Sequence, residues 1–225
     1  MHNIFKFIVS GLVFGSVATV AWSQTEATDS VVVALWQGVE VEMDIVPLLS
    51  NFSGDRDSYR YEALARINLK NKYFPVIEAG YESSNEQLYN GISYRGDGFF
   101  YRLGIDMNMI RSATKEVANN KFLLGARLGM TDFSYDLRNI PFVDPYSGNT
   151  GRLDKAGLSS SHFWFEIVAG VRIEILKNLM MGWTIRSKNP IGETLPGETG
   201  PYYIPGFGKA GGGVWAFNYV IGYQF

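Results

Sequence analysis

The segment that decides the fold is Trp215-Ala-Phe-Asn-Tyr-Val-Ile-Gly-Tyr-Gln-Phe225, in which large apolar residues alternate with small or polar ones. Successive side chains of a β-strand point to opposite faces, so the alternation predicts a strand with one almost wholly aromatic face. That face carries Trp215, Phe217, Tyr219, Ile221, Tyr223 and Phe225. On the other face, Val220 is the one large apolar residue. At a chain terminus such a strand can fray or pair with other chains, which makes it rare in soluble proteins. The segment therefore predicts an apolar environment for its aromatic face.

Seven further segments show the same alternation, and together they predict an all-β chain. The predicted strands cover 36–48, 58–70, 74–83, 98–110, 121–134, 161–176, 179–187 and 215–225. In the core of these strands the ionisable residues fall on one face, and the apolar face carries none. A bilayer imposes this segregation, because an Arg or Lys facing lipid at the midplane costs about 2–4 kcal/mol. The pattern predicts an eight-stranded antiparallel transmembrane β-barrel, and its aromatic ending resembles the signal read by the outer-membrane assembly machinery.

The predicted connections alternate in length. Long or medium connections cover 51–58, 84–97, 111–120, 135–160 and 188–213, whereas 71–73 and 177–178 are minimal. With both termini in the periplasm, the long connections mostly fall outside the cell and the short turns inside, as is usual in outer-membrane barrels.

A soluble, lipocalin-like barrel is the alternative fold, with its polar face outward and its apolar face lining a pocket. Alternation alone does not exclude this fold, because the same pattern fits with the faces exchanged. It leaves unexplained the terminal Phe225, the order of the connections, and an apolar face too large for an eight-stranded interior.

The first 23 residues predict a cleaved signal peptide. Lys6 precedes an apolar stretch, and Ala21-Trp22-Ser23 places small residues at the −3 and −1 positions of a cleavage site before Gln24. The stretch is too short and too rich in glycine for a membrane-spanning helix of about 20 residues. We therefore expect a barrel over residues 24–225, located in the outer membrane of a Gram-negative cell.

Composition excludes several classes of protein. The chain has no Cys, so disulfides, thiol chemistry and a lipid anchor on an N-terminal Cys are excluded. The formal charge is −2 and becomes −3 when Lys6 leaves with the signal peptide, because the leader holds no acids. Nothing in this balance predicts a nucleic-acid partner.

The predicted inward face is densely charged. Its ionisable residues are Glu40, Glu42, Asp44, Arg60, Glu62, Arg66, Glu78, Glu82, Arg102, Asp106, Arg127, Glu166, Arg172, Glu174 and Arg186. An eight-stranded interior is only just wide enough for its own side chains, and unpaired charges there would be costly to desolvate. The sequence therefore predicts a salt-bridged filling, and a narrow ion or small-solute pore along the acids is the alternative. Inward glycines that would make room for the arginines are Gly80, Gly104, Gly125, Gly129, Gly170, Gly182 and Gly222.

One constellation could support catalysis. Ser160, His162 and Glu166 share a face of a predicted strand, and a Ser-His-acid set can activate a hydroxyl. Residues two apart on a strand are separated by about 6–7 Å, which is long for a direct hydrogen bond. A polar rim without catalysis is therefore favoured over a lipid-modifying enzyme. The sequence shows no metal-ligand spacing, phosphate loop or nucleotide motif, so no cofactor is expected.

The 188–213 connection is the most distinctive, because its four prolines restrict the backbone. Tyr202, Tyr203, Pro205 and Phe207 within it would be costly to expose, so we expect a lid over the barrel mouth or contact with a partner. Residues Pro141, Phe142, Val143 and Pro145 of the 135–160 connection are expected to pack beside it.

Four segments carry a resemblance to a known family. They are Arg102-Leu-Gly-Ile-Asp-Met-Asn108, Phe165-Glu-Ile-Val-Ala-Gly-Val-Arg-Ile-Glu174, Met181-Gly-Trp-Thr-Ile-Arg186 and Pro201-Tyr-Tyr-Ile-Pro-Gly-Phe207. Over nearly the whole mature length the chain resembles an uncharacterised family of small outer-membrane β-barrel proteins with OmpA-like architecture. The resemblance implies an outer-membrane barrel and brings no catalytic residues. We expect a non-enzymatic structural or interaction component, or an accessory subunit of an outer-membrane complex, with three partners: membrane lipid, the assembly machinery and an outer-membrane protein.

Overall fold

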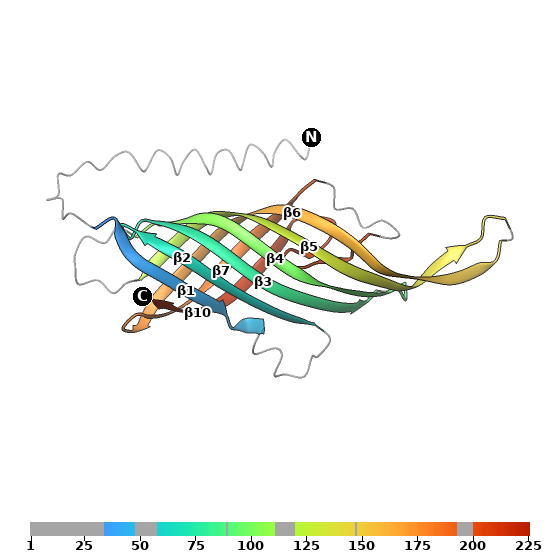
Figure 1. The fold of residues 1–225 in the computed structure, drawn as a ribbon, viewed down its shortest axis with the longest axis horizontal. Coiled ribbons are helices and arrows are strands. Elements are labelled where there is room, and N and C mark those ends of the chain that lie inside the picture. Colours follow the sequence, from blue (N-terminus) through green and yellow to red (C-terminus); the bar gives the residue numbers. More distant parts are fainter. Residues whose placement is uncertain (1–33, 48–57, 89, 111–119, 147, 193–199) are drawn as a thin grey trace, which may run out of the picture. The chain divides into compact units, whose positions relative to one another are not determined.

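The computed structural model describes residues 34–47, 58–88, 90–110, 120–146, 148–192 and 200–225 (Figure 1). The predicted signal peptide over 1–23 lies outside these residues. So do the predicted connection over 111–120, except its last residue, and most of the one over 51–58.

Eight antiparallel strands join in one closed ring of hydrogen bonds, in the order β1-β10-β7-β6-β5-β4-β3-β2. They are β1 (Trp36–Asp44), β2 (Tyr59–Leu69), β3 (Tyr73–Gln87), β4 (Ser93–Asn108), β5 (Lys121–Val143), β6 (Thr150–Leu176), β7 (Leu179–Ile191) and β10 (Val214–Gln224). Two short strands in the β7–β10 connection, β8 (Tyr203–Ile204) and β9 (Gly208–Lys209), pair only with each other. The prediction of eight antiparallel strands is confirmed, with different bounds.

The C-terminal strand closes the ring. β10 pairs with β7 from Val214 to Tyr223 and with β1 from Val220 to Gln224. Beyond the strand, the Phe225 N–H donates to the Val39 carbonyl at 2.8 Å. From Val220 onward, β10 is therefore paired on both edges, so closure of the ring removes the edge hazard at the C-terminal end of the strand.

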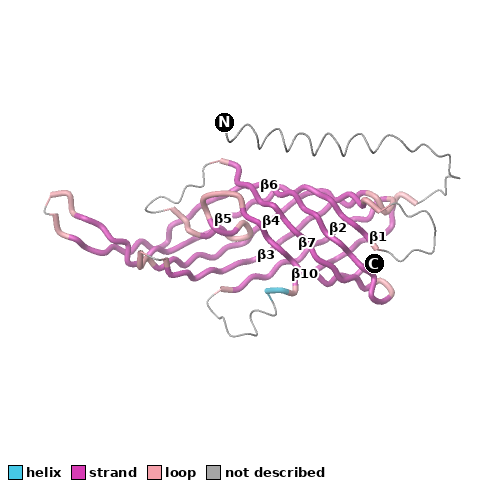
Figure 2. Tube along the Cα trace, turned by 180° about the vertical axis from the view of Figure 1, so that it is seen from behind, coloured by secondary structure: helices cyan, strands magenta, loops and turns pink. Residues whose placement is uncertain are grey.

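The predicted loop over 135–160 is wrong. Most of these residues extend β5 and β6 as a two-stranded ribbon that projects past the neighbouring strands (Figures 1 and 2). β4 pairs with β5 only as far as Arg138, and β7 pairs with β6 only from Phe163. On β5 the buried Phe133, Tyr135 and Leu137 continue the alternation past the predicted strand end. On β6 the Gly- and Ser-rich sequence shows no alternation, and the strand forms there because it pairs with β5.

The other connections refine the predicted pattern. The expected long connection over 84–97 shrinks to residues 88–92, because β3 and β4 both extend into it. The two minimal turns are confirmed, and Asn71 and Asn178 adopt the left-handed backbone that asparagine tolerates. Pro141, Phe142, Val143 and Pro145 are all exposed on the ribbon, so the expected packing against the 188–213 segment is wrong.

The ring separates two chemically different faces. Large apolar side chains point outward, among them Leu103, which is 61% exposed, and Phe99, which is 58% exposed. Charged side chains such as Glu78 and Arg102 point inward and are buried. The lipocalin-like alternative requires the opposite arrangement, with the apolar face inside. In the described part of the chain, no helix has the length and apolar character needed to cross a membrane.

Candidate functional site

The predicted inward charges meet inside the ring. All fifteen are buried except Arg60 and Glu174. The Arg60 side chain is 21% exposed and pairs with Asp44 at 3.1 Å. Glu174 lies at the β6–β7 turn, where its carboxylate accepts the Asn178 N–H at 2.9 Å. Apart from Asp44 and Glu82, the remaining groups form the charge network described next.

Glu78 is the centre of the charge network. Its carboxylate is fully buried and accepts hydrogen bonds from three guanidinium groups. Oε2 lies 2.9 Å from Arg102 Nη1 and 2.7 Å from Arg186 Nη1, and Oε1 lies 2.9 Å from Arg127 Nε. Charge-assisted bonds of this kind are stronger than neutral ones. Strands β3, β4, β5 and β7 are therefore joined across the interior through one side chain.

Two further carboxylates bridge the same guanidiniums. Glu62 lies 3.0 Å from Arg102 and 3.2 Å from Arg186. Glu166 lies 2.8 Å from Arg102 and 3.1 Å from Arg186. Each carboxylate thus faces more than one guanidinium, which offsets the cost of removing the charges from water.

A second group of ion pairs lies nearer the short turns. Arg172 makes two bonds to Glu42, of 2.7 and 2.8 Å, and Arg66 lies 2.8 Å from the same carboxylate. Lys121 donates to Glu40, which also pairs with Arg66 at 3.5 Å. Asp106 connects this group to the first one through Arg127 at 2.8 Å.

Sequence reasoning missed two buried cations, Lys121 and Lys188. Lys121 opens β5 in the same register as Arg127, and Lys188 lies one residue past the predicted end of β7, in register with Arg186. The strand end explains only Lys188, because the predicted strand 121–134 already included Lys121 on its inward face. With Glu174 assigned to the turn, the described interior holds equal numbers of acids and bases. The eight acids are Glu40, Glu42, Asp44, Glu62, Glu78, Glu82, Asp106 and Glu166, and the eight bases are Arg60, Arg66, Arg102, Lys121, Arg127, Arg172, Arg186 and Lys188.

An apolar layer lies inside the ring on the side of the projecting ribbon, and the sequence did not predict it. Its buried residues include Tyr94, Phe100, Phe133, Tyr135 and Trp164. The inward glycines make room for the aromatic rings of this layer as well as for the arginine side chains. A Cβ at Gly80 would lie 2.2 Å from the Phe100 ring, and one at Gly129 would lie 2.2 Å from Trp164. At Gly104 and Gly182, by contrast, the neighbouring side chains are Arg127 and Arg172, as predicted.

Little free space remains between the charged side chains. A cavity of about 10 Å³ lies among Arg66, Asp106, Arg127 and Arg172. That volume accommodates about one water molecule. The described interior is therefore packed through the level of the charge network.

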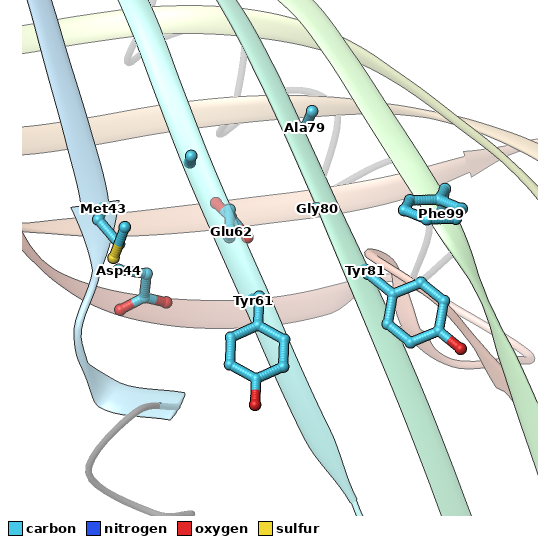
Figure 3. A pocket seen from close by; sticks show the side chains of 9 residues that line it. Met43, Asp44, Tyr61, Glu62, Ala79, Gly80, Tyr81 and Phe99 are labelled. Carbon is cyan, nitrogen blue, oxygen red and sulfur yellow. The ribbon is translucent and has the colours of Figure 1, made fainter.

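A larger hollow lies on the outer wall of the ring rather than in its interior (Figure 3). Its volume is about 280 Å³, and its lining is almost wholly apolar. Ala63 and Ala79 face each other in register at its floor, and Tyr61, Tyr81 and Phe99 rise beside them. This outer groove offers shape and apolar contact but no group arranged for chemistry.

Ser160 and His162 approach more closely than predicted. Ser160 Oγ lies 3.2 Å from His162 Nε2, because the two side chains lean together on the same face of β6. Glu166, the third expected member, instead accepts the Trp164 N–H at 2.7 Å and pairs with arginines. Among the described residues, no carboxylate hydrogen-bonds His162 and no group of three His, Asp or Glu residues is placed to hold a metal.

The described part of the 188–213 connection folds into the mouth of the ring. Ile204 and Phe207 are 0% and 2% exposed, Pro205 is buried, and Tyr203 is half-buried. Tyr202 lies beside Tyr94, with ring centroids 6.3 Å apart. This is the lid arrangement, one of the two expected from the sequence. Residues 193–199 of this connection lie outside the described part.

The sequence of the chain matches a known family. The model of a family described as a domain of unknown function (DUF6048) matches residues 4–225, which is nearly the whole chain. No curated protein matches. The comparison therefore supplies a family without an activity, and any function has to be argued from the ring and its interior.

Proposed function

The chain belongs to the DUF6048 family, and we propose that it is an integral outer-membrane β-barrel with a closed interior and a non-enzymatic structural or interaction role. One observation carries the proposal: the ring is apolar outside and ion-paired inside. Soluble proteins rarely expose an apolar patch larger than a few hundred Å². A lipid surrounding makes the outward face favourable instead.

Continuity of the outward apolar face supports this proposal. One cross-strand row follows the pairing register through six neighbouring strands, β1 to β6. It consists of Val41, Ala65, Ile77, Leu103, Leu128 and Phe165. The row one step further from the short turns, Met43, Ala63, Ala79, Tyr101, Met130 and Phe163, is equally free of charge. Such bands, bordered by aromatic residues, are typical of barrels that cross the outer membrane.

The packed interior argues against the pore alternative. Ion pairs and the apolar layer fill the lumen, and the 200–213 segment covers its mouth. An open path for ions would need the charge network to separate, which would leave buried charges without partners. We expect the purified barrel to show no channel openings in planar bilayers.

An interaction role fits the projecting ribbon of β5 and β6. In the proposed orientation the short turns face the periplasm, so the ribbon extends away from the cell surface. Tyr146 at its tip is 98% exposed, and Val143 beside it is 64% exposed. A protein partner in the outer membrane or outside the cell would meet this element first. For the enzyme alternative, the Ser160–His162 pair has no described acid to orient the imidazole.

Substituting Leu103→Arg tests the membrane assignment. Leu103 lies between Ile77 and Leu128 in the apolar row, so an arginine there would face lipid. We expect the free energy of unfolding in lipid vesicles to fall by about 2–4 kcal/mol, measured by urea titration. The matched control is Leu153→Arg, at a site 45% exposed on the ribbon, where water surrounds the side chain and little change is expected. Equal, small effects at both positions would argue that Leu103 faces water.

A further inference from the structure

The segment in the mouth of the ring has the geometry of a bound peptide. β8 and β9 form a tight hairpin in which the Phe207 N–H donates to the Ile204 carbonyl at 3.0 Å. Gly206 lies at the turn with φ +76°, a backbone conformation that favours glycine. The turn thus presents the Gly206 peptide groups and the Phe207 ring to the interior.

Three buried charged side chains converge on Gly206. Its N–H donates to Glu82 Oε2 at 2.7 Å, and its carbonyl accepts from Arg102 Nη2 at 2.8 Å and Lys188 Nζ at 2.7 Å. The N–H and the carbonyl of Gly206 are therefore both hydrogen-bonded to charged side chains of the ring wall. Charge-assisted bonds of this kind are among the stronger hydrogen bonds in proteins.

Glu82 and Lys188 differ from the other interior charges in their choice of partners. Among the described residues, the hydrogen-bond partners of these two side chains all lie in the mouth segment: Tyr203 and Gly206 for Glu82, and Gly206 for Lys188. The pKa of Tyr203 is raised by burial and by the adjacent carboxylate, so its hydroxyl remains a donor. The ring wall thus carries polar groups whose hydrogen bonds serve the peptide rather than the wall itself.

The aromatic layer supplies an apolar pocket for the same segment. The Phe207 ring packs edge-on against Trp164, with centroids 5.8 Å apart. Phe100 lies under the turn, and a Cβ at Gly206 would come within 2.4 Å of its ring. Tyr94 donates to the Tyr203 carbonyl at 2.5 Å. A concave apolar site with a few convergent polar groups is the usual form of a binding pocket.

The connection from this segment to β10 is rich in glycine. It runs through Gly211, Gly212 and Gly213, and Gly211 has φ +107°. A Cβ at Gly212 would have no neighbour within 4 Å. Three consecutive glycines with open space around the middle one leave the segment held by its contacts in the mouth rather than by its link to the strand.

From these contacts we propose that the mouth of the ring is a peptide-binding chamber, which the chain's own Tyr203–Phe207 segment occupies. Its ligand class is a tight-turn peptide with a glycine at the turn followed by an aromatic residue. The glycine peptide binds Glu82, Arg102 and Lys188, and the aromatic ring enters the pocket beside Trp164. The tethered segment blocks the chamber, because a tethered ligand has an effective concentration of about millimolar or more. An external peptide of this chemistry enters when the segment is displaced.

The test removes the mouth segment and asks whether the empty chamber binds the same sequence as a free peptide. Residues 200–210 of the full chain are replaced by a Gly-Ser linker of equal length, and the capped peptide Pro-Tyr-Tyr-Ile-Pro-Gly-Phe is titrated by calorimetry. We expect one peptide to bind per ring in the linker variant and no binding to the unaltered chain. The peptide carrying Gly206→Ala should bind about tenfold more weakly, because alanine disfavours the left-handed turn and meets Phe100.

A second pair of variants tests the polar groups of the chamber. In the linker variant, Glu82→Gln should weaken binding of the same peptide, whereas Glu174→Gln, at the β6–β7 turn and away from the mouth segment, should not. A folded linker variant that ignores the peptide, or binds it and a scrambled sequence equally, would overturn the proposal. Should the linker variant not fold, Ile204→Ala with Phe207→Ala in the full chain empties the pocket in place. This chain must then bind the peptide more tightly than the unaltered chain does, and the absence of any gain would refute the chamber.

Discussion

Replacing Glu78 with Gln should lower the free energy of unfolding of the ring by about 3–5 kcal/mol, the usual cost of removing one partner from a buried ion pair. Glutamine keeps the size of the side chain but removes the charge that faces Arg102, Arg127 and Arg186. Those guanidiniums are themselves buried and would be left with too few carboxylates. Unfolding in urea, followed by loss of β-sheet circular dichroism, measures the effect.

The control for Glu78→Gln is Glu86→Gln on the same strand. Glu86 is partly exposed near the end of β3, outside the charge network, so we expect a change within about 0.5 kcal/mol. If Glu78→Gln and Glu86→Gln were equally harmless, the interior charges would not act as a coupled network. That result would indicate a hydrated, more open lumen.

Replacing Phe225 with Ala should deplete the folded protein in the outer membrane while barely changing the stability of molecules that do fold. The Phe225 ring is 71% exposed and contacts Tyr223, at a centroid distance of 4.9 Å. Its N–H bond to Val39 belongs to the backbone and survives the substitution. A small structural role combined with a large loss of assembled protein would indicate recognition of the C-terminal aromatic during delivery.

Two comparisons make the Phe225 result interpretable. Phe225→Trp keeps an aromatic ending and should restore assembly. Phe163→Ala removes a ring that is 55% exposed at the opposite end of the apolar band, and it should assemble normally. Immunoblots of outer-membrane fractions, with boiled and unboiled samples to separate folded from unfolded forms, give the amounts. Normal membrane levels of Phe225→Ala would contradict the assembly-signal interpretation.

Period-two alternation was sufficient to predict the ring but not the whole of its strands. The alternation assigned residues such as Arg102 and Leu103 to opposite faces, and those faces are the ones observed. It failed on β6 before Ser161, where Gly, Ser and charged residues follow one another without alternation. That stretch is a strand because β5 pairs with it, which is a property of two segments and not of either one alone.

The contacts in the interior could likewise be predicted only in part from the sequence. Face assignment identified which charges enter the ring, but which groups meet depends on register and side-chain length. Three arginines on different strands reach Glu78, and no spacing along the chain encodes that convergence. The contacts of the mouth segment were even less predictable from the sequence. Its aromatic residues predicted a lid or a contact with a partner, yet the residue that three charged side chains bind is Gly206, which has no side chain.

Site-specific cysteine labelling tests the membrane assignment most directly, because the chain has no Cys of its own. Leu103→Cys places a thiol in the outward apolar row, and Tyr146→Cys places one at the exposed tip of the ribbon. On intact cells, a membrane-impermeant maleimide should label Tyr146→Cys and leave Leu103→Cys unmodified until the protein is denatured. Labelling of Leu103→Cys in the native protein as fast as Tyr146→Cys would contradict the proposal that lipid surrounds the ring.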